Sequence, residues 1–224
     1  MGQRLSVVVL ISGSGTNLQA IIDASRQGDI AAHIVAVVSD KSEAFGLRRA
    51  ERAGIPCRVL PASGFPDRET YDEALGEMLA GLAPDLVVLA GFMRILTGGL
   101  VRRWAGRMLN IHPSLLPAYR GLHTHRRVLD AGETHHGTSV HFVTEELDGG
   151  PVIAQARLAI RPDDTEDSLN GRIQALEHRL YPTVIGWFAQ GRLRMIGDRV
   201  EFDGRLLDGP VIRDESEWLR SSAE

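Results

Sequence analysis

Apolar residues in the first part of the chain gather into runs that alternate little with polar residues. These runs, all rich in Val, Ile and Leu, lie at positions 5–12, 33–40, 57–61 and 86–92. Such runs are typical of strands that are covered on both faces, as in a parallel sheet. Between these runs, apolar residues recur with the period of an α-helix. The expected helix ends are marked by Gly28, Gly54, Gly81 and Pro84. The alternation predicts a doubly wound, mostly parallel α/β sheet with right-handed crossovers.

The pattern changes in the second half of the chain. A predicted helix at 97–104 leads into the strand-like segment "RMLNIH", and a short helix is expected at 124–131. The segments "GTSVHFV" and "GPVIAQARLAI" alternate apolar and polar residues on either side of "EELDGG". Alternation of this kind indicates antiparallel strands joined by a turn, so we expect a mixed sheet.

The last third of the chain predicts a long helix and a small hairpin. Thr165 is the expected cap of the helix, and the hairpin is expected to turn at Asp203 and Gly204. We found no internal repeat and no linker, so we expect a single domain over 1–224. Its core would span about 5–191, and the hairpin and tail would span about 192–224.

Composition narrows the class of protein. The 224 residues are 43% hydrophobic, which is enough for a substantial core. A net charge of -4 is poorly matched to a polyphosphate backbone, so we expect no nucleic-acid partner. One cysteine, Cys57, excludes an intramolecular disulfide and fits a cytoplasmic location. No apolar run approaches the roughly 20 residues that cross a bilayer, so we expect no membrane association.

A glycine-rich turn follows the first strand, in the segment "ISGSGTNLQA". The amides of Gly15, Thr16 and Asn17 can point at an anion there, assisted by the helix N-terminus, which favours a phosphate. Leu18 stands where the dinucleotide fingerprint has its third glycine, and the lysine of a nucleoside triphosphate loop is missing. An ordinary tight turn without a ligand is the alternative interpretation.

Asn110 and His112 end an apolar strand, the place where open α/β sheets bind ligands. Residues two apart on a strand share a face, so both side chains can converge on one carbonyl. A carboxamide and a protonated imidazole both donate hydrogen bonds, which suits a developing oxyanion. Asp148, in the turn "LDGG", is the candidate carboxylate that would keep the imidazole charged. A structural histidine at the strand end is the alternative.

The chain also contains the histidine clusters "HTH" and "HH". Neither has the spacing of a helical zinc site, and no second cysteine exists, so we expect no metal. Ser12, Ser14, Ser114 and Cys57 show no pattern of a nucleophile paired with a base.

Five segments together resemble the phosphoribosylglycinamide formyltransferase family: "ISGSGTNLQAII", "LAGFMRIL", "LNIHPSLLPAYRGLHTH", "HGTSVHFVTEELDGGPVIAQ" and "LEHRLYP". The resemblance implies a Rossmann-like formyltransferase fold and the folate-dependent formylation of glycinamide ribonucleotide in purine synthesis. The co-substrate would be 10-formyltetrahydrofolate, and no covalent enzyme intermediate is implied. Asn110 and protonated His112 would hold the oxyanion. Asp148 would keep His112 charged and help to move a proton from the amine to N10.

The resemblance also implies how the ribonucleotide binds. Gly15, Thr16 and Asn17 would take its phosphate, and Gly91 would allow close approach. Glu177 would accept hydrogen bonds from the ribose.

Folate would need an apolar slot with hydrogen-bonding groups along its edge. The resemblance places these residues around it: Met93, Arg94, Ile95, Leu96, Val101, His141, Val143, Thr144, Glu145, Glu146 and Leu147. Arg68 would reach the charged glutamate tail.

Three other functions are weighed against this resemblance. Formyltetrahydrofolate deformylases carry a regulatory domain before the catalytic one, whereas the first strand here is expected from Leu5. Methionyl-tRNA formyltransferases add a basic C-terminal domain, which the tail here does not resemble. A sugar-phosphate-binding protein without turnover would not need Asn110, His112 and Asp148. The sequence leaves open whether the chain is a monomer or a homodimer.

Overall fold

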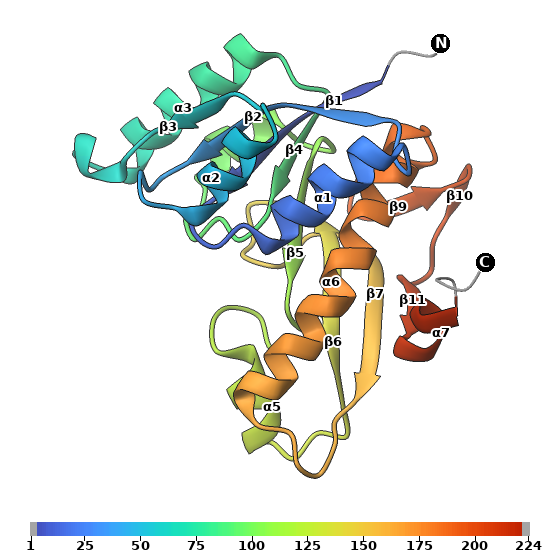
Figure 1. Cartoon of the computed structure of the whole chain (residues 1–224). Helices are drawn as coiled ribbons and strands as arrows, with labels where there is room; N and C mark the ends of the chain where they lie inside the picture. Colours follow the sequence, from blue (N-terminus) through green and yellow to red (C-terminus); the bar gives the residue numbers. More distant parts are fainter. Residues whose placement is uncertain (1–3, 221–224) are drawn as a thin grey trace.

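The apolar runs form the centre of an eight-stranded sheet with the order β11-β7-β6-β5-β4-β1-β2-β3 (Figure 1). The computed structural model describes residues 4–220, so both ends of the expected 1–224 domain lie outside the described residues. The strands of this sheet are β1 (Leu5–Ile11), β2 (Ala32–Ser39), β3 (Cys57–Val59), β4 (Leu86–Leu89), β5 (Met108–His112), β6 (His135–Phe142), β7 (Val152–Ala159) and β11 (Val211–Asp214).

Helices cover both faces of the sheet (Figure 1). The helices are α1 (Thr16–Gln27), α2 (Phe45–Arg52), α3 (Arg68–Leu82), α4 (Gly98–Arg103), α5 (Thr124–Asp130), α6 (Glu166–Ala189) and α7 (Glu215–Arg220), with a 3-10 turn at Ala62–Gly64. β6 runs antiparallel to β5 and β7, whereas the other paired strands of this sheet are parallel. The predicted doubly wound, mostly parallel mixed sheet is therefore confirmed.

Strand β1 shows why its apolar run does not alternate. Val7, Val9 and Ile11 pack with side chains of α1 and α6, whereas Val8 and Leu10 pack with side chains of α3 and α4. All five side chains are fully buried. Burial of each contributes about 1.5–3 kcal/mol relative to an exposed position, so both faces of β1 must be apolar.

Helix α6 is held at two points that matter for the site. At its start, Thr165 and Ser168 form a reciprocal capping box. Farther along the helix, the Tyr181 hydroxyl donates to the carbonyl oxygens of Leu89 in β4 and Leu109 in β5, which are 2.9 and 3.0 Å away. These contacts fix α6 against β4 and β5, one helical turn after Glu177.

Two local details differ from the sequence prediction. Helix α3 passes Gly81 and ends at Leu82, where Ala83 (φ 45°) takes the left-handed capping position ahead of Pro84. The predicted turn at Asp203 and Gly204 is present, but a second hairpin precedes it. Together they form a small sheet of β8 (Leu193–Ile196), β9 (Arg199–Phe202) and β10 (Arg205–Leu206).

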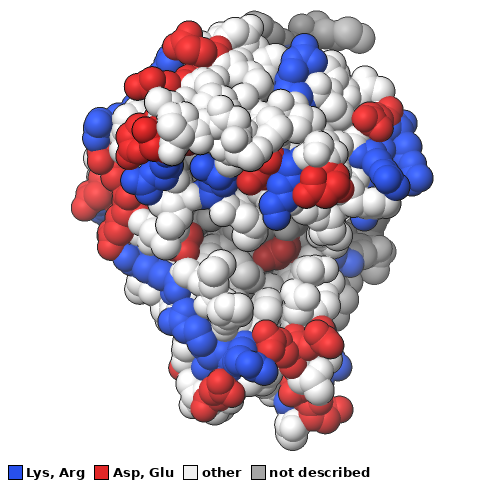
Figure 2. All heavy atoms as spheres, turned by 90° about the vertical axis from the view of Figure 1, so that its left-hand side faces the viewer, with Lys and Arg blue, Asp and Glu red and all other residues white. Residues whose placement is uncertain are grey.

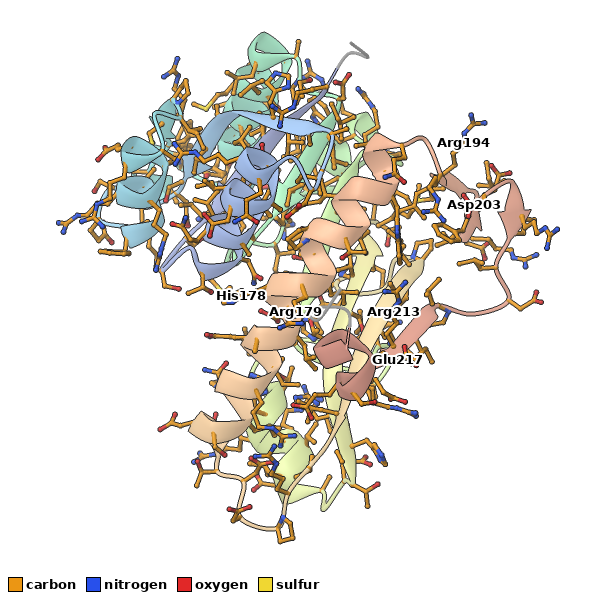
Figure 3. The ribbon with its side chains drawn as sticks, turned by 45° about the vertical axis from the view of Figure 1, so that its right-hand side comes forward. His178, Arg179, Arg194, Asp203, Arg213 and Glu217 are labelled. Atoms are coloured by element: carbon orange, nitrogen blue, oxygen red, sulfur yellow. The ribbon has the colours of Figure 1, made fainter. Side chains whose placement is uncertain are left out.

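The chain then returns to the main sheet, which the sequence analysis did not predict. Strand β11 pairs in parallel with β7, and the following α7 packs against α6 and β7. Figure 3 shows this C-terminal segment, which carries Arg213 and Glu217, beside the helix that carries His178 and Arg179. Strand β11 has only four residues, too few for a periodic signal, and its neighbour in the sheet is distant in sequence.

Candidate active site

The molecule is hollowed where the parallel strands end, and acidic and basic side chains surround the hollow (Figure 2). Two pockets open there. The first, which we call the ribonucleotide-side pocket, has a volume of about 430 Å³. Its lining residues are Ser12, Gly13, Ser14, Gly15, Thr16, Asn17, Lys41, Ala90, Gly91, Met93, Ile111, Pro113, Asn170, Gln174 and Glu177.

The second, which we call the folate-side pocket, is smaller, at about 100 Å³. Its lining residues are Leu89, Phe92, Arg94, Ile95, Leu96, Val101, Asn110, His141, Val143, Thr144, Glu145, Glu146, Leu147 and Asp148. The end of β5 separates the two pockets, because Asn110 lines the second whereas Ile111 and Pro113 line the first.

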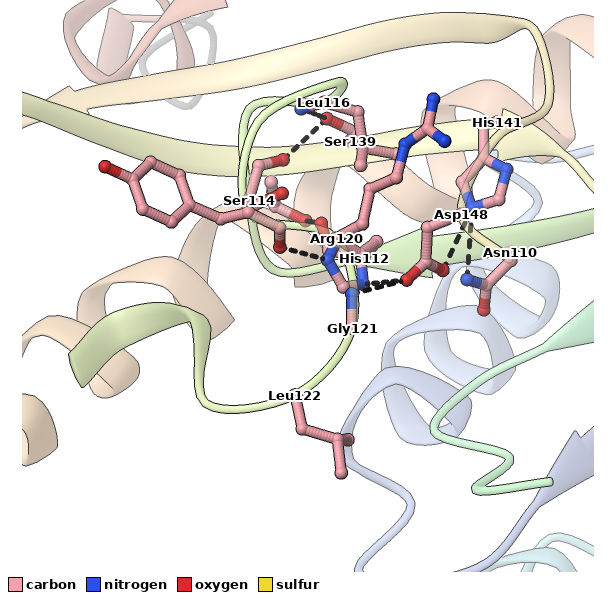
Figure 4. Close-up of polar contacts among 12 residues, drawn as sticks. Asn110, His112, Ser114, Leu116, Arg120, Gly121, Leu122, Ser139, His141 and Asp148 are labelled. Carbon is pink, nitrogen blue, oxygen red and sulfur yellow. Dashed lines mark hydrogen bonds and ion pairs between the residues drawn. The ribbon is translucent and has the colours of Figure 1, made fainter. Parts of the chain in front are cut away.

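Asn110, His112 and Asp148 lie together at this boundary (Figure 4). The Nδ1 atom of His112 is 3.4 Å from Oδ2 of Asp148, and both side chains are 8% exposed. Gly121 donates its backbone N–H to the same carboxylate oxygen at 2.9 Å. The structure thus brings together the three residues that the sequence analysis selected for catalysis.

Both ring nitrogens of His112 face hydrogen-bond acceptors. Its Nε2 atom is 3.1 Å from the carbonyl oxygen of Tyr119, and its Nδ1 atom faces the carboxylate of Asp148. Both partners are acceptors, so each ring nitrogen is best satisfied when it carries a proton. An imidazolium beside an aspartate is also a paired buried charge, which costs far less than an unpaired one.

His141 orients the carboxamide of Asn110. Burial lowers the pKa of His141, so its ring is neutral. Its Nδ1 lies 2.9 Å from the carbonyl oxygen of Phe142 and donates there, which leaves Nε2 as an acceptor. Asn110 donates one N–H of its side chain to this Nε2 at 3.1 Å. The second N–H of the Asn110 carboxamide is then available to a ligand.

The turn that carries Asp148 is shaped differently from our expectation. We expected the two following glycines to bend the backbone, but Asp148 itself has the left-handed conformation (φ 49°). Gly150 is needed for close approach, since a Cβ there would lie 1.9 Å from the carbonyl oxygen of Phe142. The three atoms nearest to a Cβ on Gly149 would all belong to the flexible side chain of Glu146.

The glycine loop lines the ribonucleotide-side pocket as the N-terminus of α1. Gly15 caps the helix with φ 69°, and a Cβ there would lie 2.6 Å from the Cα of Gly46. Gly91 also has positive φ (75°), but no protein atom crowds its Cβ position. Its conformation, rather than crowding by the protein, therefore selects glycine at 91.

A buried hydrogen-bond network links this pocket to the strand that carries His112. Asn17 donates its Nδ2–H to Oε2 of Glu177 at 2.8 Å. Thr138 Oγ1 lies 3.3 Å from Oε1 of Glu177 and 3.0 Å from the carbonyl oxygen of His112. Burial raises the pKa of the Glu177 carboxyl, and the hydrogen bonds from Asn17 and Thr138 oppose that shift.

The structure divides the predicted binding residues between the two pockets. Gly15, Thr16, Asn17, Gly91 and Glu177 all line the ribonucleotide-side pocket. The residues predicted around folate line the other pocket, with two exceptions, Met93 and Arg68. Met93 lines the ribonucleotide-side pocket instead. Arg68 lies at the start of α3, lines neither pocket and is 3.7 Å from Glu69.

Sequence reasoning missed several lining residues. Ser12 accepts a hydrogen bond from the Met93 backbone at 2.8 Å and so ties the end of β1 to the loop after β4. Asn170 and Gln174 precede Glu177 on α6 with the spacing of one helical face, a signal that could have identified them. Lys41 follows β2 and could have been found as a strand-end residue.

Within 4–220, no group of three or more His, Cys, Asp or Glu side chains has an arrangement that could hold a metal ion. In the same part of the chain, no helix has the length and apolar character that a membrane span needs.

Comparison with known proteins gives consistent matches. The formyl transferase family model matches residues 5–185. The phosphoribosylglycinamide formyltransferase of Escherichia coli (strain K12) is 56% identical over 203 residues, which cover 91% of this chain and 96% of that protein. The protein of the same name from Haemophilus influenzae is 49% identical over 201 residues, covering 90% and 95%.

A solved structure agrees with these matches. The phosphoribosylglycinamide formyltransferase of Coxiella burnetii, in complex with CHES, has a TM-score of 0.90 and 51% identity. The match covers 94% of this chain and 100% of that one. The resemblance that the sequence motifs indicate is confirmed, and the chain belongs to the formyl transferase family.

Proposed function

We propose that this protein transfers the formyl group of 10-formyltetrahydrofolate to the primary amine of glycinamide ribonucleotide in purine biosynthesis. The products would be formylglycinamide ribonucleotide and tetrahydrofolate. The names of its close relatives support this activity. The observation that carries it is the arrangement of three side chains: Asn110 and Asp148 line the folate-side pocket, and His112 lies against Asp148.

The reaction needs donors where negative charge develops. The amine attacks the formyl carbon, a C–N bond forms, and the carbonyl oxygen becomes an oxyanion. The free N–H of Asn110 and the Nε2–H of His112 stabilise that oxygen. The bond to N10 then breaks, and Asp148 with ordered water carries the proton of the amine to N10.

His112 must first be released from a contact within the protein. Its Nε2 lies 3.1 Å from the carbonyl oxygen of Tyr119, so the formyl oxygen has to replace that carbonyl. Tyr119 has a left-handed backbone (φ 56°), a conformation uncommon for residues other than glycine. We infer that the segment around Tyr119 moves when substrates bind.

The two pockets suit the two substrates. The glycine loop and the first turn of α1, which includes Asn17, offer N–H groups to a phosphate, and Glu177 offers carboxylate oxygens to a ribose. Asn17 Oδ1 is buried without a partner in the described residues and can accept a further hydrogen bond. Beside the folate-side pocket, Ile95 and Leu147 are 53% and 49% exposed, an apolar surface that suits a flat ring.

The test is a formyl-transfer assay with purified protein, glycinamide ribonucleotide and 10-formyltetrahydrofolate. We expect tetrahydrofolate to form only when the amine substrate is present. Release of formate without the ribonucleotide would indicate a deformylase, and binding without turnover would indicate a sugar-phosphate-binding protein. A role for Arg68 at the glutamate tail, a cytoplasmic location, and a monomeric or homodimeric state stay predictions from the sequence.

A further inference from the structure

The chain has a single lysine, Lys41, among 25 Lys and Arg residues. It follows β2, at the edge where the parallel strands end. Of the side chains that line the ribonucleotide-side pocket, Lys41 is the one basic group and Glu177 the one acidic group within the described residues. The only lysine of the protein thus lies at the pocket that contains the glycine loop.

The backbone of Lys41 is held by a buried serine. Ser39, which is fully buried, accepts a hydrogen bond from the Lys41 N–H at 3.1 Å. The Ser39 hydroxyl donates in turn to the Lys41 carbonyl oxygen at 2.8 Å. This reciprocal pair fixes the point from which the lysine side chain extends, whereas the side chain itself is exposed and keeps its flexible four-carbon stem.

The ammonium group of Lys41 is free to meet a ligand. Within residues 4–217, whose side chains are described, it has no carboxylate within ion-pair distance. The nearby basic residue Arg49 is already engaged, since its Nε donates to the carbonyl oxygen of Ser14 at 2.9 Å. Arg49 therefore supports the glycine loop, and Lys41 is the basic side chain that lines this pocket.

A phosphate monoester needs such a charge. It carries about 1.5 to 2 negative charges at neutral pH, whereas a helix N-terminus supplies the equivalent of about half a positive charge. The glycine loop and α1 therefore compensate only part of the charge of the ligand, and Glu177 in the same pocket adds a further acidic group. A mobile point charge at the rim supplies the missing compensation.

We propose that Lys41 is a specificity-determining residue that binds the phosphate monoester of the ribonucleotide and so selects it over the dephosphorylated riboside. This inference rests on the proposed function for the identity of the substrate. The contact itself does not depend on that identity: the ammonium of Lys41 contacts a phosphate held by the glycine loop.

Kinetics of formyl transfer give the first test, with Lys41→Gln, Lys41→Arg and the control Arg48→Gln. Arg48 is an exposed cation on α2 that does not line the pocket. We expect Lys41→Gln to raise KM for glycinamide ribonucleotide about tenfold with kcat little changed, as for loss of one charge-assisted contact. Lys41→Arg should recover much of the affinity, and Arg48→Gln should match the unsubstituted protein.

Kinetics with the dephosphorylated substrate, glycinamide riboside, test whether the effect depends on the phosphate. Lys41→Gln should use glycinamide riboside as well as the unsubstituted protein does, because the lost contact involves only the phosphate. An unchanged KM for the ribonucleotide in Lys41→Gln, in a protein that is active, would overturn the role of Lys41 and leave the proposed function intact.

Chemical labelling gives a second test that does not depend on turnover. An amine-acylating reagent can modify only Lys41 and the α-amino group, and mass spectrometry of peptides separates the two. We expect ribose 5-phosphate to protect Lys41 and ribose to leave it reactive, with the α-amino group as internal reference. If ribose 5-phosphate protects Lys41 from labelling but the protein has no formyl-transfer activity, the phosphate-binding role of Lys41 is supported and the proposed activity is refuted. Equal labelling of Lys41 with and without ribose 5-phosphate would refute its role in phosphate binding.

Discussion

The imidazole of His112, at the end of β5, pairs with the carboxylate of Asp148 from the β6–β7 turn, with 3.4 Å between Nδ1 and Oδ2. The carboxylate also accepts the backbone N–H of Gly121, so its position is fixed from two sides. Removal of the negative charge would leave the ring nitrogen facing a neutral group. The imidazolium of the proposed mechanism would then lose its ion-pair partner.

We therefore expect Asp148→Asn to lower kcat for formyl transfer by between about 100- and 10,000-fold, the range typical of a proton-transfer group. Asparagine tolerates the left-handed backbone at this position, so the fold should be kept. Steady-state kinetics measure the loss, and circular dichroism with a thermal melt checks the fold. A kcat within a factor of three of the original in a folded variant would remove Asp148 from the mechanism.

The glycines of the same turn make a matched pair. Gly150→Ala would place a Cβ against the backbone oxygen of Phe142, which cannot move aside, whereas Gly149→Ala would displace only the Glu146 side chain. We expect Gly150→Ala to cost about 1–3 kcal/mol of unfolding free energy and to lower kcat, because the turn that carries Asp148 must shift. Gly149→Ala should have much smaller effects on both. Equal costs in denaturant titrations of the two variants would contradict this account.

The stability of the protein should fall in acid because of a buried histidine pair. His125 Nδ1 lies 3.0 Å from His136 Nε2, and burial, with the neighbouring charges of His125 and His112, lowers the pKa of His136 to about 4. Between that value and the ordinary value of 6.5, the unfolded chain binds the proton and the folded protein does not. The contribution of His136 to the free energy of unfolding is therefore fully present above about pH 6.5 and is lost as the pH falls toward 4.

Denaturant titrations at pH 7.5, 6 and 5 measure this slope, which approaches about 1.4 kcal/mol per pH unit for one proton. His136→Asn should flatten the slope by removing the group that resists protonation. His33, an exposed histidine for which His33→Asn should leave the slope unchanged, serves as the control. Identical slopes in all three proteins would show that the pair does not set the acid sensitivity.

Glu177 is expected to cost stability and to contribute to binding. Burial raises the pKa of its carboxyl, so the folded protein holds this proton more tightly than the unfolded chain does. The favourable contribution is present below the unfolded pKa and is lost as pH rises through the folded one. Glu177→Gln should therefore be at least as stable at pH 7.5, while KM for the ribonucleotide rises about tenfold as charge-assisted hydrogen bonds to the ribose are lost.

Thermal melts and kinetics on the same preparation separate these two effects. Glu177→Gln keeps a carbonyl oxygen for the Asn17 N–H, so the buried network can persist. A less stable variant would show that the charge of Glu177 supports the fold. An unchanged KM would show that the ribose is bound elsewhere.

Local patterns predicted much of the fold and the shared strand face of Asn110 and His112. The unbroken apolar runs around Val7 and Val88 predict buried parallel strands because both faces of the sheet are covered. The two-residue spacing of Asn110 and His112 places both on one face because a strand repeats every two residues. The family resemblance, rather than any local pattern, assigned Glu177, which lies far along the chain on a helix.

Contacts between distant segments could not be predicted this way. The register of β5 with β6 sets Asn110 opposite His141, so their hydrogen bond follows from pairing and not from either segment alone. Met93 lines the ribonucleotide-side pocket although its neighbour Arg94 lines the other. Adjacent residues diverge there because the chain passes between the pockets, and no sequence period reports that path.

The sequence by itself determined the sheet, the strand end that carries Asn110 and His112, and a glycine loop at a helix N-terminus, because each depends on neighbours within a few residues. Only the tertiary structure decided that Asp148 reaches His112 and that Lys41 joins the glycine loop at one pocket. These relationships arise where separate strands end at the same edge of the sheet. That meeting is fixed by packing across the whole core, which no single segment encodes.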